Sequence, residues 1–132
     1  MRIATYLDSS VLLAEVFLEP RRPAPGFWRR KLLSSELPEY EALTRLNARP
    51  LPPQVVAAAL ELLETVELSE MTPEVLARAR DPWPVEVRTL DALHLATLVH
   101  IRAGGAYVDL ATHDHRMAAA AAALGIPLAS LT

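Results

Sequence analysis

Four carboxylates in this sequence stand at positions where a folded sheet would bring them together: Asp8, Glu41, Asp91 and Asp114. Asp8 follows a short apolar run, and Asp114 follows another such run near the C-terminus. Ligands of open parallel sheets bind beyond the carboxyl ends of the strands, so we expect these two side chains in one crevice. Carboxylates about 4 Å apart repel by roughly 4 kcal/mol per pair at an effective dielectric constant near 20. A cation or bound protons must therefore offset the charge of the cluster.

A hard divalent cation would offset this charge. Oxygen ligands alone favour Mg²⁺ or Mn²⁺ over zinc, and Mg²⁺ typically keeps several waters beside one or two protein carboxylates and a substrate phosphate. Asp91 supports this interpretation because Leu90, Ala92 and Leu93 flank it, which predicts at least partial burial. A buried aspartate is seldom unpaired. The cluster therefore predicts a Mg²⁺ or Mn²⁺ site that is open to a phosphate group.

Each of these carboxylates also has an ordinary structural explanation. Asp8 and Asp114 both suit the N-cap of a following helix, where a carboxylate accepts hydrogen bonds from free backbone N–H groups. Glu41 lies beside Glu36 and Glu39, and most glutamates on helices are solvated. The functional interpretation therefore depends on the joint pattern of the four residues rather than on any one of them.

Short apolar runs alternate with helical patterns along the chain, which predicts an α/β fold with a short central parallel sheet flanked by helices. Parallel neighbours need crossover connections, and the intervening helices supply them. The expected strands are residues 2–7, 34–37, 66–68, 107–112 and 126–128. The expected helices are residues 11–18, 27–33, 38–46, 55–63, 75–80 and 89–103, with a final alanine-rich helix between Asp114 and Gly125.

The composition limits the class of protein. A chain of 132 residues that is 52% hydrophobic fits one domain over residues 1–132 with a sizeable core. The absence of cysteine excludes disulfides, thiolate metal ligands and a cysteine nucleophile. No run of about 18 uncharged apolar residues predicts a membrane span, and Asp8 interrupts the stretch that a signal peptide would need. We therefore expect a cytoplasmic protein with no membrane partner.

Positive charge is concentrated in one stretch of a chain whose formal net charge is −3. That net charge gives no global electrostatic reason for a polyanionic partner, so nucleic-acid binding needs a local argument. The local cations are Arg21, Arg22, Arg29, Arg30 and Lys31. Such a run is commonly a solvated face. Beside Phe27 and Trp28, it would alternatively form an arm that contacts phosphates while the rings stack on an unpaired base or pack against a partner helix.

The order and spacing of the carboxylate motifs resemble the PIN-domain family of metal-dependent ribonucleases, and in particular the VapC-like toxins of toxin–antitoxin pairs. The matching segments are YLDSSVLL at 6–13, SELPEYEALTR at 35–45, LDALHLAT at 90–97 and ATHDHRM at 111–117. The resemblance spans nearly the whole chain. A strand that ends in aspartate is common, but these four segments in this order form a fairly specific pattern.

The resemblance implies a role for each matching residue. Asp8, Asp91 and Asp114 would bind the metal directly or through water, and Glu41 would complete the acidic pocket. The hydroxyl groups of Ser9 and Thr112 would orient the carboxylates or a water molecule. Asp109 competes with Asp114 for the fourth position. We prefer Asp114 because Asp109 falls inside the predicted strand, whereas Asp114 follows its end.

The resemblance also implies an activity and partners. The expected protein is a Mg²⁺-dependent endoribonuclease in which one or two ions activate water against an RNA phosphodiester. It would be a homodimer, inhibited by a cognate antitoxin whose C-terminal segment crosses the cleft and places an arginine in the metal pocket. A catalytically inactive PIN-like module that binds RNA or protein is the main alternative. A phosphatase-like or receiver-like domain is another, but it would want a lysine late in the chain, and Lys31 is the only lysine present.

Histidine and serine residues suggest two further sites that we consider weaker. His94, His113 and His115 suggest zinc, but no His-x-x-x-His pair is present, and His94 matches a position where the family often has a structural histidine. Ser9 and Ser10 with a distant histidine and aspartate suggest a nucleophilic triad. Neither a Gly-x-Ser-x-Gly elbow nor a glycine-rich phosphate loop supports that interpretation.

Overall fold

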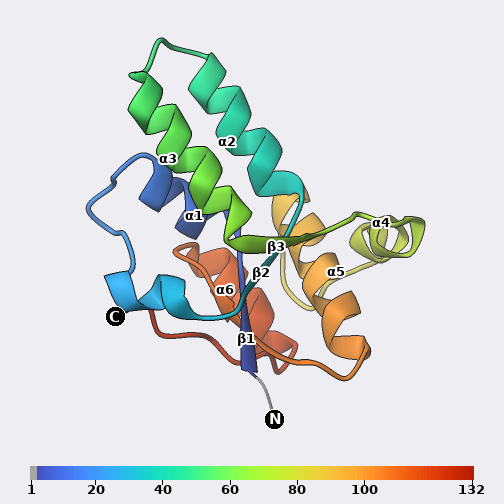
Figure 1. The fold of residues 1–132 in the computed structure, drawn as a ribbon. Helices are drawn as coiled ribbons and strands as arrows, with labels where there is room; N and C mark the ends of the chain where they lie inside the picture. Colours follow the sequence, from blue (N-terminus) through green and yellow to red (C-terminus); the bar gives the residue numbers. More distant parts are fainter. Residues whose placement is uncertain (1–2) are drawn as a thin grey trace.

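Four parallel strands in the order β3-β2-β1-β4 form the centre of the molecule in the computed structural model, which describes residues 3–132 (Figure 1). The strands are β1 (Ile3–Leu7), β2 (Leu32–Ser35), β3 (Val66–Ser69) and β4 (Tyr107–Ala111). Because every neighbouring pair is parallel, each connection must cross from one end of the sheet to the other, and helices make these crossovers. The predicted α/β class with a short parallel sheet flanked by helices is confirmed.

Helices cover both faces of this sheet (Figure 1). The α-helices are α1 (Ser9–Val16), α2 (Leu37–Asn47), α3 (Pro53–Glu64), α4 (Pro73–Arg80), α5 (Thr89–Ala103) and α6 (His115–Ala123), and η1 (Pro25–Arg29) is a short 3-10 helix. One apolar cluster packs α1, α2 and α3 against the sheet, and a second packs α5 and α6 against the opposite face. Within β1, the side chains of Tyr6 and Leu7 belong to different clusters because successive strand residues point to opposite faces.

The order of the strands creates a switch point between β1 and β4. The chain runs from β1 to its neighbour β2 and on to β3, then returns across the sheet to place β4 on the other side of β1. Connections on the two sides of β1 therefore diverge, which leaves a crevice at the carboxyl ends of β1 and β4 where ligands of open α/β sheets bind. Leu7 pairs with Ala111 at this edge, so Asp8 and Thr112 emerge side by side.

The helix predicted at residues 27–33 is wrong. The structure has only the 3-10 turn η1 there, and β2 begins at Leu32, two residues before the strand predicted at 34–37. Leu32 and Leu33 fit a helix in the sequence, but they pair with Thr5 and Tyr6 of β1. Burial in the sheet, rather than local preference, decided the conformation of these two residues.

The strand predicted at residues 126–128 is also wrong. Those residues form only an isolated bridge, in which Leu128 stands opposite Leu110. Pro127 has no N–H to donate to a ladder, which limits pairing at this position. The other predicted helices and strands are present, most of them with shifts at their ends, and Arg2 lies outside the described residues. Within residues 3–132, no helix combines the length and apolar character needed to cross a membrane.

Candidate active site

A pocket of about 630 Å³ at the carboxyl edge of the sheet is lined by all four carboxylates that the sequence singled out. Asp8 lies between β1 and α1, Glu41 on α2, Asp91 in the first turn of α5, and Asp114 directly before α6. Residues separated by as many as 106 positions thus meet because parallel strands end at one edge and their helices begin there. The pocket is the candidate active site.

Asp8 is the most buried of the four, with 4% of its surface exposed. It is the N-cap of α1: its Oδ1 accepts hydrogen bonds from the backbone N–H groups of Ser10 and Val11 at 3.1 and 3.4 Å, and from the Ser10 hydroxyl. The Thr112 hydroxyl donates to Oδ2 across the switch point. The capping role and the predicted contact with Thr112 are therefore both present, and both fix the direction of this carboxylate.

Burial raises the pKa of Asp8 to about 6, from an ordinary value of 3.8. Hydrogen bonds from Ser10, Thr112 and Val11 lower the pKa and so oppose this shift, while the negative charge of Asp114 adds to it. Loss of hydration is thus larger than the stabilisation that the hydrogen-bond donors provide. At neutral pH this carboxylate is ionised at a cost that a neighbouring cation would relieve.

Asp91 and Asp114 both lie at helix N-termini. The Oδ2 atom of Asp91 accepts from the backbone N–H of Arg88 at 3.4 Å, and the Oδ1 atom of Asp114 accepts from the N–H of Arg116 at 2.9 Å. Burial raises the pKa of Asp91, the charge of Asp114 raises it further, and Arg88 and Arg116 oppose the shift. Asp91 is half-buried, as its apolar neighbours predicted. Asp114 therefore acts electrostatically on both Asp8 and Asp91.

Glu41 reaches the pocket from α2 and accepts a hydrogen bond at Oε1 from the hydroxyl of Ser9. Ser9 is buried beside Asp8, so this bond joins the first turn of α1 to α2. The Ser9 hydroxyl also contacts the Nε2 atom of His94 at 2.9 Å. The resemblance implied that the hydroxyl of Ser9 orients a carboxylate or a water molecule, and here this hydroxyl donates to the carboxylate of Glu41.

The donor set of the pocket fits a hard divalent cation, although its present spacing forms no coordination shell. The available ligands are carboxylate oxygens, the type that Mg²⁺ and Mn²⁺ prefer. The mutual repulsion of Asp8, Asp91 and Asp114 is a second feature that a cation would relieve. Across residues 3–132, no group of three or more histidine or acidic side chains lies close enough to hold an ion as arranged.

Cations from three different segments also line the pocket: Arg21, Arg45 and Arg88. The sequence analysis named Arg21 but missed the other two. Arg45 lies one helical turn after Glu41, a spacing that puts both on one face of α2, so the signal was available. Arg88 directly precedes α5, and only the folded chain places it against the acidic cluster.

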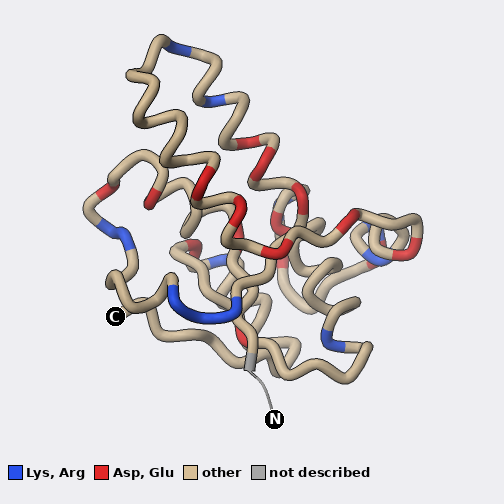
Figure 2. The backbone as a smooth tube through the Cα atoms, viewed as in Figure 1, with Lys and Arg blue, Asp and Glu red and all other residues tan. Residues whose placement is uncertain are grey.

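The rest of the predicted basic arm lies elsewhere. Arg29, Arg30 and Lys31 precede β2 and so lie at the amino edge of the sheet, opposite the carboxylates; Figure 2 shows a continuous blue segment there, in the lower half of the view. Arg30 donates to the carbonyl of Ser130 at 3.0 Å and so holds the C-terminal segment. Arg22 is exposed and is not part of the pocket lining. Of the five cations of the predicted arm, Arg21 alone lines the pocket.

Asp109 is not part of the acidic pocket. It lies within β4 and lines a different cavity, with Thr5, Arg30 and Lys31. Its Oδ1 atom is buried and finds no hydrogen-bond partner among the described residues. The preference for Asp114 over Asp109 agrees with this geometry, because Asp114 lines the pocket.

The zinc alternative gains no support. His94 is 2% exposed, and its two ring nitrogens contact Tyr6 and Ser9 at 2.8 and 2.9 Å, which leaves neither free for a metal. Burial lowers the pKa of His94 to about 4, so its ring is neutral. His115 is exposed at the start of α6.

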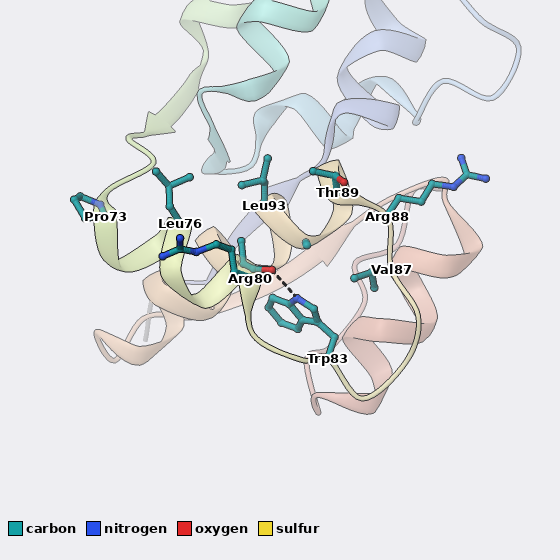
Figure 3. Close-up of a pocket in the computed structure, with 10 residues that line it drawn as sticks. Pro73, Leu76, Arg80, Trp83, Val87, Arg88, Thr89 and Leu93 are labelled. Atoms are coloured by element: carbon teal, nitrogen blue, oxygen red, sulfur yellow. Dashed lines mark hydrogen bonds between the residues drawn. The ribbon is translucent and has the colours of Figure 1, made fainter.

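A second cavity, of about 680 Å³, adjoins the acidic pocket (Figure 3). It lies between α4, α5 and the segment that joins them, and its lining is mainly apolar. Trp83 faces it and is held by a hydrogen bond from its Nε1 to the carbonyl of Ala79 at 3.3 Å and by the guanidinium of Arg78, 3.7 Å from the ring centre. Its charged lining residues are Arg80 and Arg88, so its chemistry is that of a binding surface rather than of acid, base or metal catalysis.

Comparison with known proteins agrees with the fold. The PIN domain family model matches residues 5–123, so the chain belongs to the PIN domain family. It is 34% identical over 126 residues to Ribonuclease VapC46 of Mycobacterium tuberculosis strain H37Rv, covering 93% of this chain and 94% of that protein. It is also 28% identical over 132 residues to Ribonuclease VapC47 of Mycobacterium tuberculosis strain CDC 1551, covering 95% of each.

The raised pKa of Asp8 predicts that the metal-free protein loses stability as pH rises from about 4 to about 6. In that range the unfolded chain has released the proton that folded Asp8 still holds, so the free energy of unfolding falls, by at most about 3 kcal/mol, and then levels off. Asp8→Asn should flatten this dependence and raise stability at pH 7. Urea unfolding in EDTA at several pH values measures it, and an unchanged profile in the variant would contradict the assignment.

The separation of Asp114 from Asp109 predicts different effects on metal binding. Asp114→Asn should weaken Mg²⁺ binding about tenfold or more, since even outer partners of metal ligands contribute about 10- to 100-fold. The matched control Asp109→Asn should bind Mg²⁺ like the wild type, and neither change should unfold the protein. Isothermal titration of Mg²⁺ into both variants checks this. A larger loss for Asp109→Asn would show that the site has been misplaced.

Proposed function

We propose that this protein is an endoribonuclease dependent on Mg²⁺ or Mn²⁺, and that it is the toxin of a VapBC-type toxin–antitoxin pair. The observation that carries the proposal is the convergence of four carboxylates, from four separate segments, on one pocket of a PIN-family chain. The two similar proteins that are named ribonucleases support the reaction class.

The proposed roles follow from the hydrogen bonds of each carboxylate. Asp8, Asp91 and Asp114 would hold the ion, and each already has one oxygen oriented by a backbone N–H group. Bound Mg²⁺ would supply a Lewis acid that stabilises charge on the phosphodiester and makes water a better nucleophile. Glu41 has its Oε1 engaged by Ser9, so Oε2 is the oxygen available to orient a water molecule.

The arginines around the pocket would position the RNA. Arg21, Arg45 and Arg88 place three positive charges on the lining of an acidic cleft, where they can contact phosphates on either side of the bond to be cut. Arginine contacts of this kind supply affinity and register without reading sequence. RNA contacts by Arg29, Arg30 and Lys31 stay a prediction, because their distance from the pocket would require a long or curved substrate.

The proposed partner is a cognate antitoxin. An acidic pocket with oxygen atoms from several carboxylates suits a guanidinium group, which donates hydrogen bonds to carboxylates in pairs. An antitoxin arginine placed there would both neutralise the cluster and exclude the metal. We propose in addition that the toxin acts as a homodimer, which sedimentation of the purified chain would test.

A PIN-like module that binds RNA or protein without cutting it is the second candidate. The observation that favours it is the spacing of the acidic side chains, which form no coordination shell as arranged. The two candidates differ in one measurable respect: only the nuclease needs a divalent ion to convert bound RNA into shorter products.

Cleavage of a structured RNA labelled at both ends is expected with Mg²⁺ or Mn²⁺ and should stop in EDTA. Asp8→Asn and Asp91→Asn should each lose most of the activity and stay folded, because they remove ligand charge while also reducing repulsion. Asp109→Asn is the matched control that should cut normally. Normal cleavage by the first two variants would refute the four-carboxylate site, and binding without cleavage by the wild type would favour the non-cutting module.

A comparison of two basic pairs tests how RNA is held. Arg45→Ala with Arg88→Ala should weaken RNA binding and reduce the slope of log K against log salt by about one to two, because each lost phosphate contact removes roughly 0.7–0.9 from the slope. Arg29→Ala with Lys31→Ala should change both much less. Binding is measured in EDTA over a range of salt concentrations. If the Arg29 and Lys31 substitutions had the larger effect on binding, the RNA would instead lie against the predicted basic arm at the amino edge of the sheet.

A further inference from the structure

A chain of hydrogen bonds runs from the core of the protein to the candidate active site. The hydroxyl of Tyr6 lies 2.8 Å from Nδ1 of His94, Nε2 of His94 lies 2.9 Å from the hydroxyl of Ser9, and that hydroxyl donates to Oε1 of Glu41. Tyr6 is 0% and His94 2% exposed, and their rings pack edge to face with centroids 5.8 Å apart. Polar groups thus cross the buried side of the sheet and end in the pocket.

The contribution of these hydrogen bonds to protein stability does not explain why polar residues connect Tyr6 to Glu41. Burying a hydroxyl and an imidazole costs free energy that their hydrogen bonds only roughly offset. Apolar residues of the same shape would fill this space about as well, and Leu95 and Leu98 of α5 do so beside Tyr6. A chain of polar residues that is fully paired does, however, fix side-chain directions more tightly than apolar packing.

The proton positions along this series of hydrogen bonds are set at the Glu41 end. Ser9 donates its single hydroxyl proton to Oε1 of Glu41. Ser9 can then only accept from His94, which requires the proton of the neutral ring to be on Nε2. Nδ1 is consequently an acceptor and takes the hydroxyl proton of Tyr6. The opposite direction would set the Ser9 and Glu41 oxygens against each other with no proton between them.

The chain also joins the segments that carry the carboxylates. His94 lies one turn after Asp91 on α5, and Ser9 directly follows Asp8, so one imidazole connects the helix of one proposed ligand to the strand end of another. Ser9 extends the connection to Glu41 on α2. Movement of any one of these elements would break a buried hydrogen bond.

We infer that Tyr6 and His94 are positioning residues that hold the hydroxyl of Ser9, and through it Glu41, in place against Asp8 and Asp91. The inference rests on the proposed function for its effect on catalysis. The proton positions along the chain are a property of the protein alone, and they can be measured in the absence of metal and RNA.

The first experiment measures the His94 tautomer by ¹H–¹⁵N NMR of the metal-free protein at pH 7. The expected form is neutral with its proton on Nε2. Ser9→Ala removes the acceptor of the Nε2 proton, so it should give a mixture of tautomers, whereas Tyr6→Phe leaves the Ser9–Glu41 end intact and should keep the proton on Nε2. Thr5→Val is the matched control: it replaces another buried hydroxyl of β1, which lines a different cavity with Asp109 and Arg30, and it should leave His94 unchanged. A wild-type ring with its proton on Nδ1, or an unchanged tautomer in Ser9→Ala, would overturn the inference.

The second experiment measures cleavage. Tyr6→Phe and Ser9→Ala should each lower kcat about tenfold with little change in KM, the low end of the effect of losing a partner that orients a ligand in a metal site. Thr5→Val should keep the wild-type kcat. Equal losses of kcat in all three variants would mean that general destabilisation is responsible, and would overturn the positioning role. A wild type that does not cleave RNA would refute the proposed function, while the NMR result would still decide the direction of the chain.

Discussion

The parallel pairing of β1 with β4 is the constraint on which the candidate site depends. It runs from Ile3 opposite Tyr107 to Leu7 opposite Ala111, and it places the ends of both strands together. The contact between Thr112 and Asp8 continues this pairing by one side chain. A shift of register by one residue would turn every side chain of β4 to the other face and would remove Asp114 from the pocket. The carboxylate cluster therefore exists only because the two strands meet in this register.

At the carboxyl edge of the sheet, the helix caps that favour folding also bring negative charges close enough to repel each other. Asp8 caps α1 and satisfies its first N–H groups, yet it is buried deeply enough that its pKa rises to about 6. Asp114 caps α6 and adds its charge to Asp8 and Asp91. Each capping role is favourable alone, whereas together the caps concentrate negative charge in one pocket. A site that is destabilised by its own charges is typical of a binding or catalytic centre.

Strong local signals were interpreted correctly from the sequence, and weak ones were not. Residues 89–103 form the predicted helix with the same ends, and Asp8 and Asp114 cap the helices that follow them. The helix predicted at 27–33 failed because Leu32 and Leu33 carry no local preference strong enough to resist pairing with β1. The cations at residues 29–31 have the composition of a nucleic-acid arm, but which edge of the sheet they occupy depends on where β2 begins.

By itself, the sequence determined the identity of the four acidic residues, the helices and strands that carry them, and the α/β class. It could do so because capping, periodicity and the order of the segments are local properties of the chain. Only the tertiary structure decided which groups share the pocket. It brought Arg45 and Arg88 to the carboxylates, left Asp109 outside, and joined Tyr6 to Glu41 through His94 and Ser9. Contacts of this kind depend on strand register and on the packing of helices that are distant along the chain, and no short segment of sequence contains that information.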